Sequence, residues 1–260
     1  MGEVTGIQWT SHTWNPWQGC QKVSPGCDNC YMFRDKQRYG QDPETVMRSK
    51  PPTFRAPLKW NREARESSDP RRVFVASWAD FFSREADEWR ADAWAIIREC
   101  ESLVFQVLTK RHARIAANLP SDWGDGYPNV WLGVSGENQE WADRRWAALS
   151  QIPARVRFIS YEPAIDKLTM RDWPTVPDWL IIGGESGRDA RIFDASWARA
   201  LIAECRERGC APFVKQLGAV ALDSDWYGFA PLPLTDSHGS DPSEWPEDLR
   251  VREWPEVRHA

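Results

Sequence analysis

The sequence has no long hydrophobic run, and this absence argues against a membrane-spanning helix. No apolar stretch of the 260-residue chain reaches the roughly 18 residues that such a helix needs. Residues 1–6 have neither a basic start nor an apolar core, so no secretory signal is visible. We therefore expect a cytoplasmic protein without a membrane partner.

The composition also lacks the extremes that mark disordered, collagen-like or coiled-coil chains. Hydrophobic residues make up 42% of the chain and charged residues 27%, which is typical of a globular protein. A chain of 260 residues can bury a sizeable core as one domain or two small ones.

An overall excess of basic charge is absent, because the formal net charge is −5. The charge is nevertheless uneven along the chain. Residues 31–72 hold 11 Lys or Arg against 6 Asp or Glu, whereas residues 219–260 hold 3 against 9. This pattern fits a polyanion site near the N-terminal half, and solvated surface charge is the simpler alternative.

Cysteine is scarce, and half of it lies in one short segment. Of six cysteines, Cys20, Cys27 and Cys30 form a C-x6-C-x2-C pattern with intervening glycines and a proline that bend the chain back. Three converging thiolates suit a soft metal or an iron–sulfur cluster. A structural zinc site normally has four ligands, and His12 is the nearest histidine. A cluster is the leading interpretation, with zinc, thiols without a metal or a disulfide as alternatives.

The rest of the chain alternates short apolar runs with amphipathic helical patterns. From the second run on, starts lie 23 to 33 residues apart, the length of one strand and its crossover helix. The runs are Thr13–Trp17, Val73–Ala76, Leu103–Leu108, Val130–Val134, Val156–Ile159, Trp179–Ile182 and Pro212–Val214, and the helical patterns lie near 85–100, 110–118, 137–151 and 194–209. We predict an α/β fold, a partial (β/α) barrel of about six to seven parallel strands with a C-terminal extension. An open doubly wound sheet is the alternative.

Domain boundaries follow from composition. We assign residues 1–217 to the barrel, with the cysteine loop at 19–31 and an irregular basic excursion at 40–72 that has short helices and is a candidate lid. Residues 218–260 are rich in proline, acid and tryptophan, which favours an ordered extension packed on the barrel over a disordered tail. The remaining cysteines, Cys100, Cys205 and Cys210, are interpreted as core thiols.

A polar cluster follows each apolar run. In a parallel barrel the C-terminal strand ends meet at one mouth, where active sites are built. Each polar residue taken alone fits a helix cap or a buried ion pair equally well, but seven clusters in series favour a site. The candidates are Ser77, Asp80, Lys110, Ser135, Glu162, Gly183, Gly184, Glu185 and Lys215.

Several segments together resemble a known family. They are Thr13–Pro16, Gly19–Cys20, Ser24–Tyr31, Leu108–Arg111, Gly133–Ser135, Ser160–Pro163, Gly183–Gly187, Lys215–Gln216 and Trp245–Arg252. They resemble the phage-type three-cysteine-motif family, found in bacteriophage and bacterial genomes. That family looks like an outlying branch of the radical S-adenosylmethionine superfamily, distantly related to spore photoproduct lyase. The resemblance covers nearly the whole chain.

The resemblance implies a [4Fe–4S] cluster on Cys20, Cys27 and Cys30. It also implies that S-adenosylmethionine binds at the unique iron and is cleaved reductively to a 5′-deoxyadenosyl radical, with flavodoxin or ferredoxin as the usual electron donor. Two features differ from the superfamily pattern. Its common spacing is C-x3-C-x2-C, and its Gly-Gly-Glu follows the second strand, whereas Gly183–Glu185 follows the predicted sixth.

On this interpretation the cofactor-binding candidates surround S-adenosylmethionine. We assign Asp80 and Glu185 to the methionine ammonium group, and Lys110 or Lys215 to its carboxylate. Glycine permits close backbone approach, so Gly133–Ser135 and Gly183–Gly184 are assigned to the adenine or ribose. Ser77 completes the cofactor set, and Glu162 joins Lys215 as the catalytic pair through a substrate contact or a proton.

Two other functional classes fit the same residues. In the first, the cysteines hold zinc or a structural cluster, and the basic segment binds nucleic acid. In the second, an unrelated barrel enzyme uses Glu162, Glu185 and Lys215 for acid/base chemistry. For the radical enzyme we predict a nucleic acid or nucleotide substrate, because the basic stretch directly follows the cysteine loop and the resemblance points to a base or its sugar. The residues predicted to line the groove are Arg48, Lys50, Arg55, Lys59 and Arg62.

Overall fold

The computed structural model describes residues 5–66, 71–225 and 230–257. The chain forms two compact units. Unit 1 contains residues 1–23, 32–134 and 151–155, and unit 2 contains residues 24–31, 135–150 and 156–260. The cysteine loop is therefore shared, with Cys20 in unit 1 and Cys27 and Cys30 in unit 2.

Unit 1 is built on parallel strands. They are β1 (His12–Trp14), β4 (Arg71–Val75), β5 (Leu103–Thr109) and β6 (Val130–Ser135), and they pair in that order. Every residue of β6 is buried, as expected of a parallel strand that is covered on both faces. A short antiparallel pair, β2 (Trp17–Gln18) with β3 (Met47–Arg48), accompanies them.

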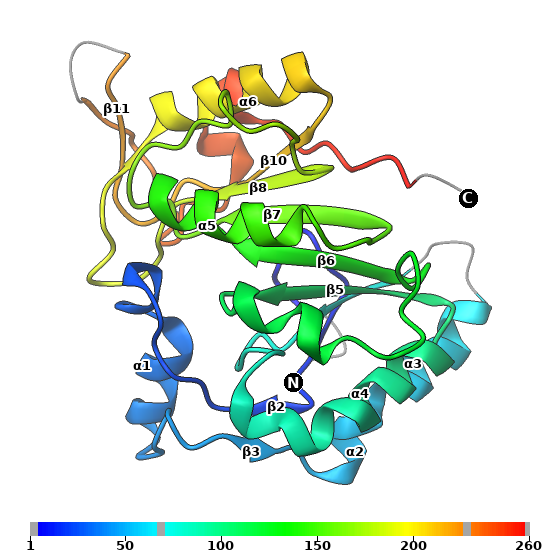
Figure 1. Cartoon of the computed structure of the whole chain (residues 1–260). Coiled ribbons are helices and arrows are strands. Elements are labelled where there is room, and N and C mark those ends of the chain that lie inside the picture. The colour runs from blue at the N-terminus through cyan, green and yellow to red at the C-terminus, as the bar shows by residue number, and fades with distance from the viewer. Residues whose placement is uncertain (1–4, 67–70, 226–229, 258–260) are drawn as a thin grey trace. The chain divides into compact units, whose positions relative to one another are not determined.

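The helices of unit 1 are α1 (Tyr31–Arg38), α2 (Pro51–Phe54), α3 (Ala56–Arg65) and α4 (Asp87–Glu99), with a 3-10 turn, η2 (Arg84–Ala86), before α4. Prolines at the first positions of α2 and α3 begin these helices where no amide hydrogen bond is lost. Helices α3 and α4 pack against each other (Figure 1). The predicted excursion at 40–72 does contain short helices, and its role as a lid stays a prediction.

The prediction of a helix over 110–118 is wrong. Two 3-10 turns, η3 (His112–Arg114) and η4 (Ala116–Asn118), stand there instead. Neither turn buries a residue of its own, and Ile115 between them is buried, but one apolar side chain does not form the apolar face that holds an α-helix in place. The Arg114 side chain bonds back to the Phe82 carbonyl at 2.8 Å and to Asp87, which fixes the segment by polar contacts.

Unit 2 carries the parallel strands β7 (Val156–Tyr161), β8 (Trp179–Gly183) and β10 (Ala211–Gln216). Its helices are α5 (Gln139–Leu149) and α6 (Ala195–Arg208), and α6 packs on β10 (Figure 1). Asp194 caps α6 by accepting from the Ser196 amide at 2.9 Å, and Gly209 ends it in the left-handed conformation.

The strand order distinguishes the two predicted α/β folds. The seven parallel strands follow one another as β1-β4-β5-β6-β7-β8-β10 without a reversal. A doubly wound sheet reverses its order at a switch point, whereas a barrel progresses in one direction. The predicted partial (β/α) barrel is confirmed. None of the described helices is long and apolar enough to cross a membrane.

The C-terminal residues extend unit 2. A small sheet forms from β9 (Phe193–Asp194), β11 (Ala221–Asp223) and β12 (Ala230–Pro231), followed by η5 (Pro242–Glu244) and η6 (Glu247–Leu249). Residues 251–253 then run antiparallel to β10, with the Val214 amide donating to Val251 at 2.8 Å and Glu253 to Pro212 at 2.9 Å. Such pairing covers backbone groups of β10 that would otherwise be open. The predicted domain boundary at residue 217 stays a prediction.

The end of α6 gives a clean test of backbone conformation. Gly209 has φ of 73°, and a Cβ added there would meet no atom within 4 Å. Gly209→Ala should therefore lower the free energy of unfolding by about 1 kcal/mol through backbone strain alone. Gly209→Asn, which tolerates this conformation better, should lose less. Urea unfolding measures both, and equal losses would contradict the explanation.

Candidate functional site

Cys27 and Cys30 lie on one tight turn of unit 2. Residues Pro25–Cys27 form a 3-10 turn, η1, and the Cys30 amide donates to the Cys27 carbonyl at 3.4 Å. Cys27 is buried and Cys30 is half-buried, while Ser24 Oγ lies 3.9 Å from Cys27 Sγ. Two of the three predicted ligands therefore share one turn, called here the cysteine turn (residues 24–30).

An ion pair at the start of α5 holds one side of the cysteine turn. Glu137 and Arg145 are both 0% exposed, and Arg145 Nη1 lies 2.5 Å from Glu137 Oε2. Arg145 Nη2 donates to Ser24 Oγ at 2.8 Å, and the Gly26 amide donates to Glu137 Oε1 at 3.3 Å. Arg145 also donates to the backbone carbonyl of Ser135 at 2.9 Å. Ser135, a predicted cofactor residue, thus has a contact that belongs to the fold. We call Glu137 and Arg145 the inner pair.

A second ion pair, from the loop after β8, holds the other side. Arg191 binds Glu185 in a bidentate manner, with Nε 2.9 Å from Oε2 and Nη2 2.6 Å from Oε1. Asn29 Nδ2 donates to Glu185 Oε2 at 3.0 Å, and Arg191 Nη1 donates to the Pro25 carbonyl at 3.0 Å. We call Glu185 and Arg191 the outer pair.

The environment of Glu185 favours its charged form. Burial opposes ionisation, but hydrogen bonds from Arg191 and Asn29 outweigh it, so the pKa of Glu185 lies below its usual value. Because a depressed pKa marks a carboxylate that the fold stabilises, Glu185 is a strongly held anion in unit 2.

Cys20 lies in unit 1, in the segment that follows β2. Its amide donates to the Pro43 carbonyl at 3.0 Å, and it follows Gly19, whose φ is 102°. A Cβ on Gly19 would lie 2.2 Å from the Thr45 carbonyl oxygen, so only glycine fits at this bend. Arg111 donates to the Gln21 carbonyl at 3.2 Å, directly beyond Cys20.

All six cysteines are thiols. Among the described residues, no three His, Cys, Asp or Glu side chains stand close enough to hold a metal ion. Cysteines of two units contribute to the predicted ligand set, which therefore stays a prediction. His12 of the zinc alternative is buried on β1, with its ring stacked on Trp60 at 4.6 Å.

Two predicted cofactor residues of unit 1 join strand ends to one another. Asp80 accepts hydrogen bonds from Thr109 Oγ1 at 2.6 Å and from the Lys110 amide at 2.9 Å, which links the segment after β4 to the end of β5. Ser77 Oγ accepts from Asn15 Nδ2 at 3.0 Å, which links it to the residue after β1. The Lys110 side chain is half-buried. These contacts are structural, and the assigned cofactor roles stay predictions.

The two predicted catalytic residues do meet. Lys215 Nζ forms an ion pair with Glu162 Oε1, and their side chains are 16% and 19% exposed. Lys215 stands at a register shift of β10. Val214 pairs with Ile182 and Gln216 pairs with Gly183, so two steps along β10 match one step along β8. Such irregularities re-aim a side chain. Gly183 lies beneath the pair, since an added Cβ would be 3.3 Å from the Glu162 carboxyl carbon.

Gly184 has a packing reason of its own. A Cβ at this position would lie 2.2 Å from the Leu217 carbonyl oxygen, which is far inside contact distance. The Gly184 amide also donates to the Gln216 carbonyl at 3.0 Å. This fit against the neighbouring chain explains the glycine without a ligand, and its predicted contact with a nucleoside stays untested.

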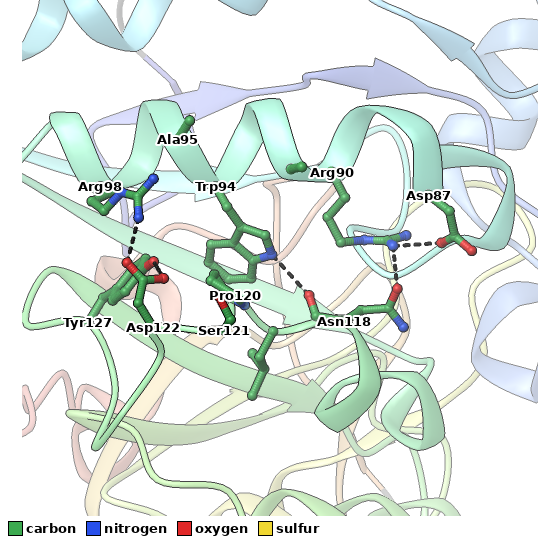
Figure 2. A pocket seen from close by; sticks show the side chains of 12 residues that line it. Asp87, Arg90, Trp94, Ala95, Arg98, Asn118, Pro120, Ser121, Asp122 and Tyr127 are labelled. Carbon is green, nitrogen blue, oxygen red and sulfur yellow. Dashed lines mark hydrogen bonds and ion pairs between the residues drawn. The ribbon is translucent and has the colours of Figure 1, made fainter.

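A surface cavity of about 350 Å³ lies elsewhere in unit 1, between α4 and residues 118–127. Figure 2 shows Arg90 bonded to Asp87 and Asn118, and Arg98 facing Asp122. None of the predicted site residues lines it. Because these labelled groups bond to one another, the cavity offers no evident ligand-binding group, and we assign it no function.

The sequence reasoning missed Arg145, Arg191 and Asn29. Arg145 had a usable signal, because Ala142, Trp146 and Leu149 form the buried face of α5 and Arg145 lies on that same face. An arginine on a buried helical face indicates a buried acidic partner. No sequence pattern marks Arg191, because the loop after β8 turns back and brings it into contact with Glu185.

A family described as "Protein of unknown function (DUF5131)" has a sequence profile that matches residues 4–250. The chain belongs to this family. Among curated proteins, no relative matches the chain.

One solved structure similar to this family member is "Spore photoproduct lyase complexed with dinucleoside spore photoproduct". The identity is 12% and the TM-score 0.45, with 74% of this chain and 60% of that chain covered. The expected distant relationship to that lyase stays a prediction. Assignment to a phage-type three-cysteine family stays a prediction.

Removing only one partner of the inner pair should strongly lower the free energy of unfolding. Arg145→Met leaves Glu137 charged and buried without its cation, and should cost about 3–5 kcal/mol of unfolding free energy. The matched control is Arg144→Met, which removes an exposed partner of Glu140 on the same helix and should cost less than about 0.5 kcal/mol.

Chemical denaturation of both variants decides this prediction. Adding Glu137→Leu to Arg145→Met should recover part of the loss, because the uncompensated charge is then gone. A single-variant loss no larger than that of the control would contradict it.

Proposed function

We propose that the chain is an iron–sulfur enzyme of the radical S-adenosylmethionine type. The observation that carries the proposal is the cysteine turn, where two thiols of the C-x6-C-x2-C motif are held between two carboxylate–guanidinium pairs. A turn that served only as a connection to α1 would not need two ion pairs with buried carboxylates to fix its shape.

The donors fit the implied group by their chemistry. Thiolates are the ligands of iron–sulfur clusters, and the motif supplies three of them in Cys20, Cys27 and Cys30. Three thiolates leave one iron of a four-iron cluster without a protein ligand, which is the position that S-adenosylmethionine would take. When bound, the cluster would supply the electron that cleaves S-adenosylmethionine reductively.

The chain's own residues would bind the cluster and S-adenosylmethionine, orient them and exclude water from around them. Glu162 and Lys215, at the ends of β7 and β10, are the proposed catalytic pair. Lys215 Nζ donates a hydrogen bond to Glu162 Oε1, so a substrate group that displaces Glu162 could accept from the same ammonium group. A ligand carboxylate could replace Glu162 as the partner of the same ammonium group. Both roles need the bulge that aims Lys215 at Glu162.

We extend the proposal to a nucleic acid or nucleotide substrate. Its support is the surface of α2 and α3, where Lys50, Arg55 and Arg62 are exposed. The other two predicted groove residues already have acidic partners, Arg48 with Asp92 at 2.6 Å and Lys59 with Glu63 at 3.6 Å. The basic surface is thus smaller than the sequence indicates, and three cations remain for phosphate.

Metal analysis tests the first part of the proposal. Anaerobically reconstituted protein should contain about four irons and four sulfides per chain and be brown. Dithionite and S-adenosylmethionine should then yield 5′-deoxyadenosine. Cys27→Ala should abolish both properties, whereas the control Cys100→Ala, which removes a buried thiol outside the motif, should retain them.

The alternatives make different predictions in the same experiment. One zinc per chain in a colourless protein would support the binding-module interpretation. Iron with no 5′-deoxyadenosine would contradict the radical chemistry, and turnover retained in Cys27→Ala would support an acid/base barrel enzyme.

Salt dependence tests the substrate class. Each neutralised phosphate releases a counterion, so affinity for single- or double-stranded DNA or RNA should fall steeply with salt. Changing Lys50, Arg55 and Arg62 together to Glu should weaken binding. It should also reduce the slope of log affinity against log salt concentration by roughly two to three. The matched control changes three exposed arginines of unit 2, Arg144, Arg171 and Arg206, to Glu. No association at low salt with any of these nucleic acids would contradict the polymer version of this proposal.

A further inference from the structure

We propose that Glu185 is a positioning residue for the cysteine turn and makes no contact with the cofactor. This inference rests on the proposed function only in that the turn is taken to hold a cluster. It reassigns the most conspicuous acidic residue of the Gly183–Glu185 motif, which the sequence places at the methionine ammonium group.

Both oxygens of the Glu185 carboxylate are already engaged by donors of the protein itself. Oε1 accepts from Arg191 Nη2, and Oε2 accepts from Arg191 Nε, from the Arg191 amide and from Asn29 Nδ2. Each carboxylate oxygen has about two lone pairs, so Oε2 with three donors is fully occupied, and Oε1 is held by the Arg191 guanidinium. The side chain is also only 6% exposed. A ligand would have to displace Arg191 or Asn29 from the carboxylate.

The same contacts connect Glu185 to the cysteine turn from two directions. Asn29 lies in the sequence between Cys27 and Cys30, so its hydrogen bond holds the middle of the C-x2-C segment. Asn29 also donates to the Asp189 carbonyl at 2.7 Å. Arg191, fixed on Glu185, donates to the Pro25 carbonyl at 3.0 Å, and Pro25 begins the 3-10 turn that ends at Cys27.

The two glycines before Glu185 fix its backbone. Gly184 packs against Leu217, and the Glu185 carbonyl accepts from the Ala219 amide at 2.8 Å. An added Cβ on Gly218 would lie 2.7 Å from the Glu185 carbonyl oxygen, so both chains approach closely there. This close packing holds the backbone of Glu185 at the end of β8, and it accounts for Gly184 without a ligand.

The outer pair is more exposed than the inner pair and stands on a loop rather than on a packed helix. Glu137 and Arg145 are 0% exposed and belong to the packing of α5, whereas Arg191 is 30% exposed and stands on a loop. Loss of the outer pair should therefore open the cysteine turn locally and leave the rest of unit 2 folded. Local opening can be measured through the thiols themselves, with or without iron.

The experiment is site-resolved alkylation of the apoprotein by iodoacetamide, followed by mass spectrometry. Glu185→Gln keeps the shape of the side chain and removes its charge, and should raise the labelling rates of Cys27 and Cys30 roughly tenfold. Asn29→Ala should have a similar effect. Cys100, Cys205 and Cys210 are buried at 0–4% exposure and should label no faster in these variants.

The matched control is Glu204→Gln. Glu204 is another buried carboxylate of unit 2, which accepts from Thr169 Oγ1 and the Met170 amide, each at 2.7 Å. It should leave the labelling of Cys27 and Cys30 unchanged. Unchanged labelling in Glu185→Gln, or an equal rise at all buried cysteines, would overturn the positioning role.

Iron release to a chelator from the reconstituted protein separates this proposal from the function on which it rests. Faster release from Glu185→Gln than from Glu204→Gln would support it. If the wild-type chain assembles no cluster but the labelling of Cys27 and Cys30 rises as expected, the proposed function fails and the positioning role stands. If labelling and iron release are unchanged while binding of S-adenosylmethionine is lost, Glu185 is a cofactor ligand and the proposal fails.

Discussion

A fully buried carboxylate–guanidinium pair, Glu137 with Arg145, joins the cysteine turn to α5. Removing both charges from water is costly, and their mutual attraction repays this only when further hydrogen bonds satisfy both groups. Here the further partners are Ser24 and Gly26, which belong to the turn. The pair can therefore be well satisfied only when the turn is in place, so that the electrostatics of α5 and the shape of the turn are parts of one arrangement.

The same principle organises the polar strand ends. Asp80 joins the segment after β4 to β5, and the Glu162–Lys215 ion pair joins the ends of β7 and β10. Backbone and side-chain groups at strand ends need partners because the ladder no longer supplies them. Many polar residues that look like ligand-binding groups in the sequence thus satisfy one another. What distinguishes Glu162 and Lys215 is partial exposure together with a bulged strand, which leaves their charges accessible to a third group.

The strands and the barrel order were predictable because buried parallel strands are apolar on both faces and recur with each crossover helix. The segment at 110–118 was not, because its side chains bond to Phe82 and Asp87, and periodicity contains no information on such contacts. Likewise, Glu162, Glu185 and Lys215 could be selected as polar residues at strand ends. Their partners could not all be selected, since Arg191 reaches Glu185 through a loop whose path the sequence does not reveal.

The pairing of residues 251–253 with β10 links the C-terminal segment to the chemistry of the strand end. Arg252 donates to the carbonyls of Val214 and Lys215, each at 3.3 Å, and its guanidinium lies over the rings of Phe213 and Trp245. These carbonyls flank the register shift that aims Lys215 at Glu162. The C-terminal segment thus holds the backbone of Lys215 itself, so a change in residues 251–253 is expected to disturb the geometry of the Glu162–Lys215 pair.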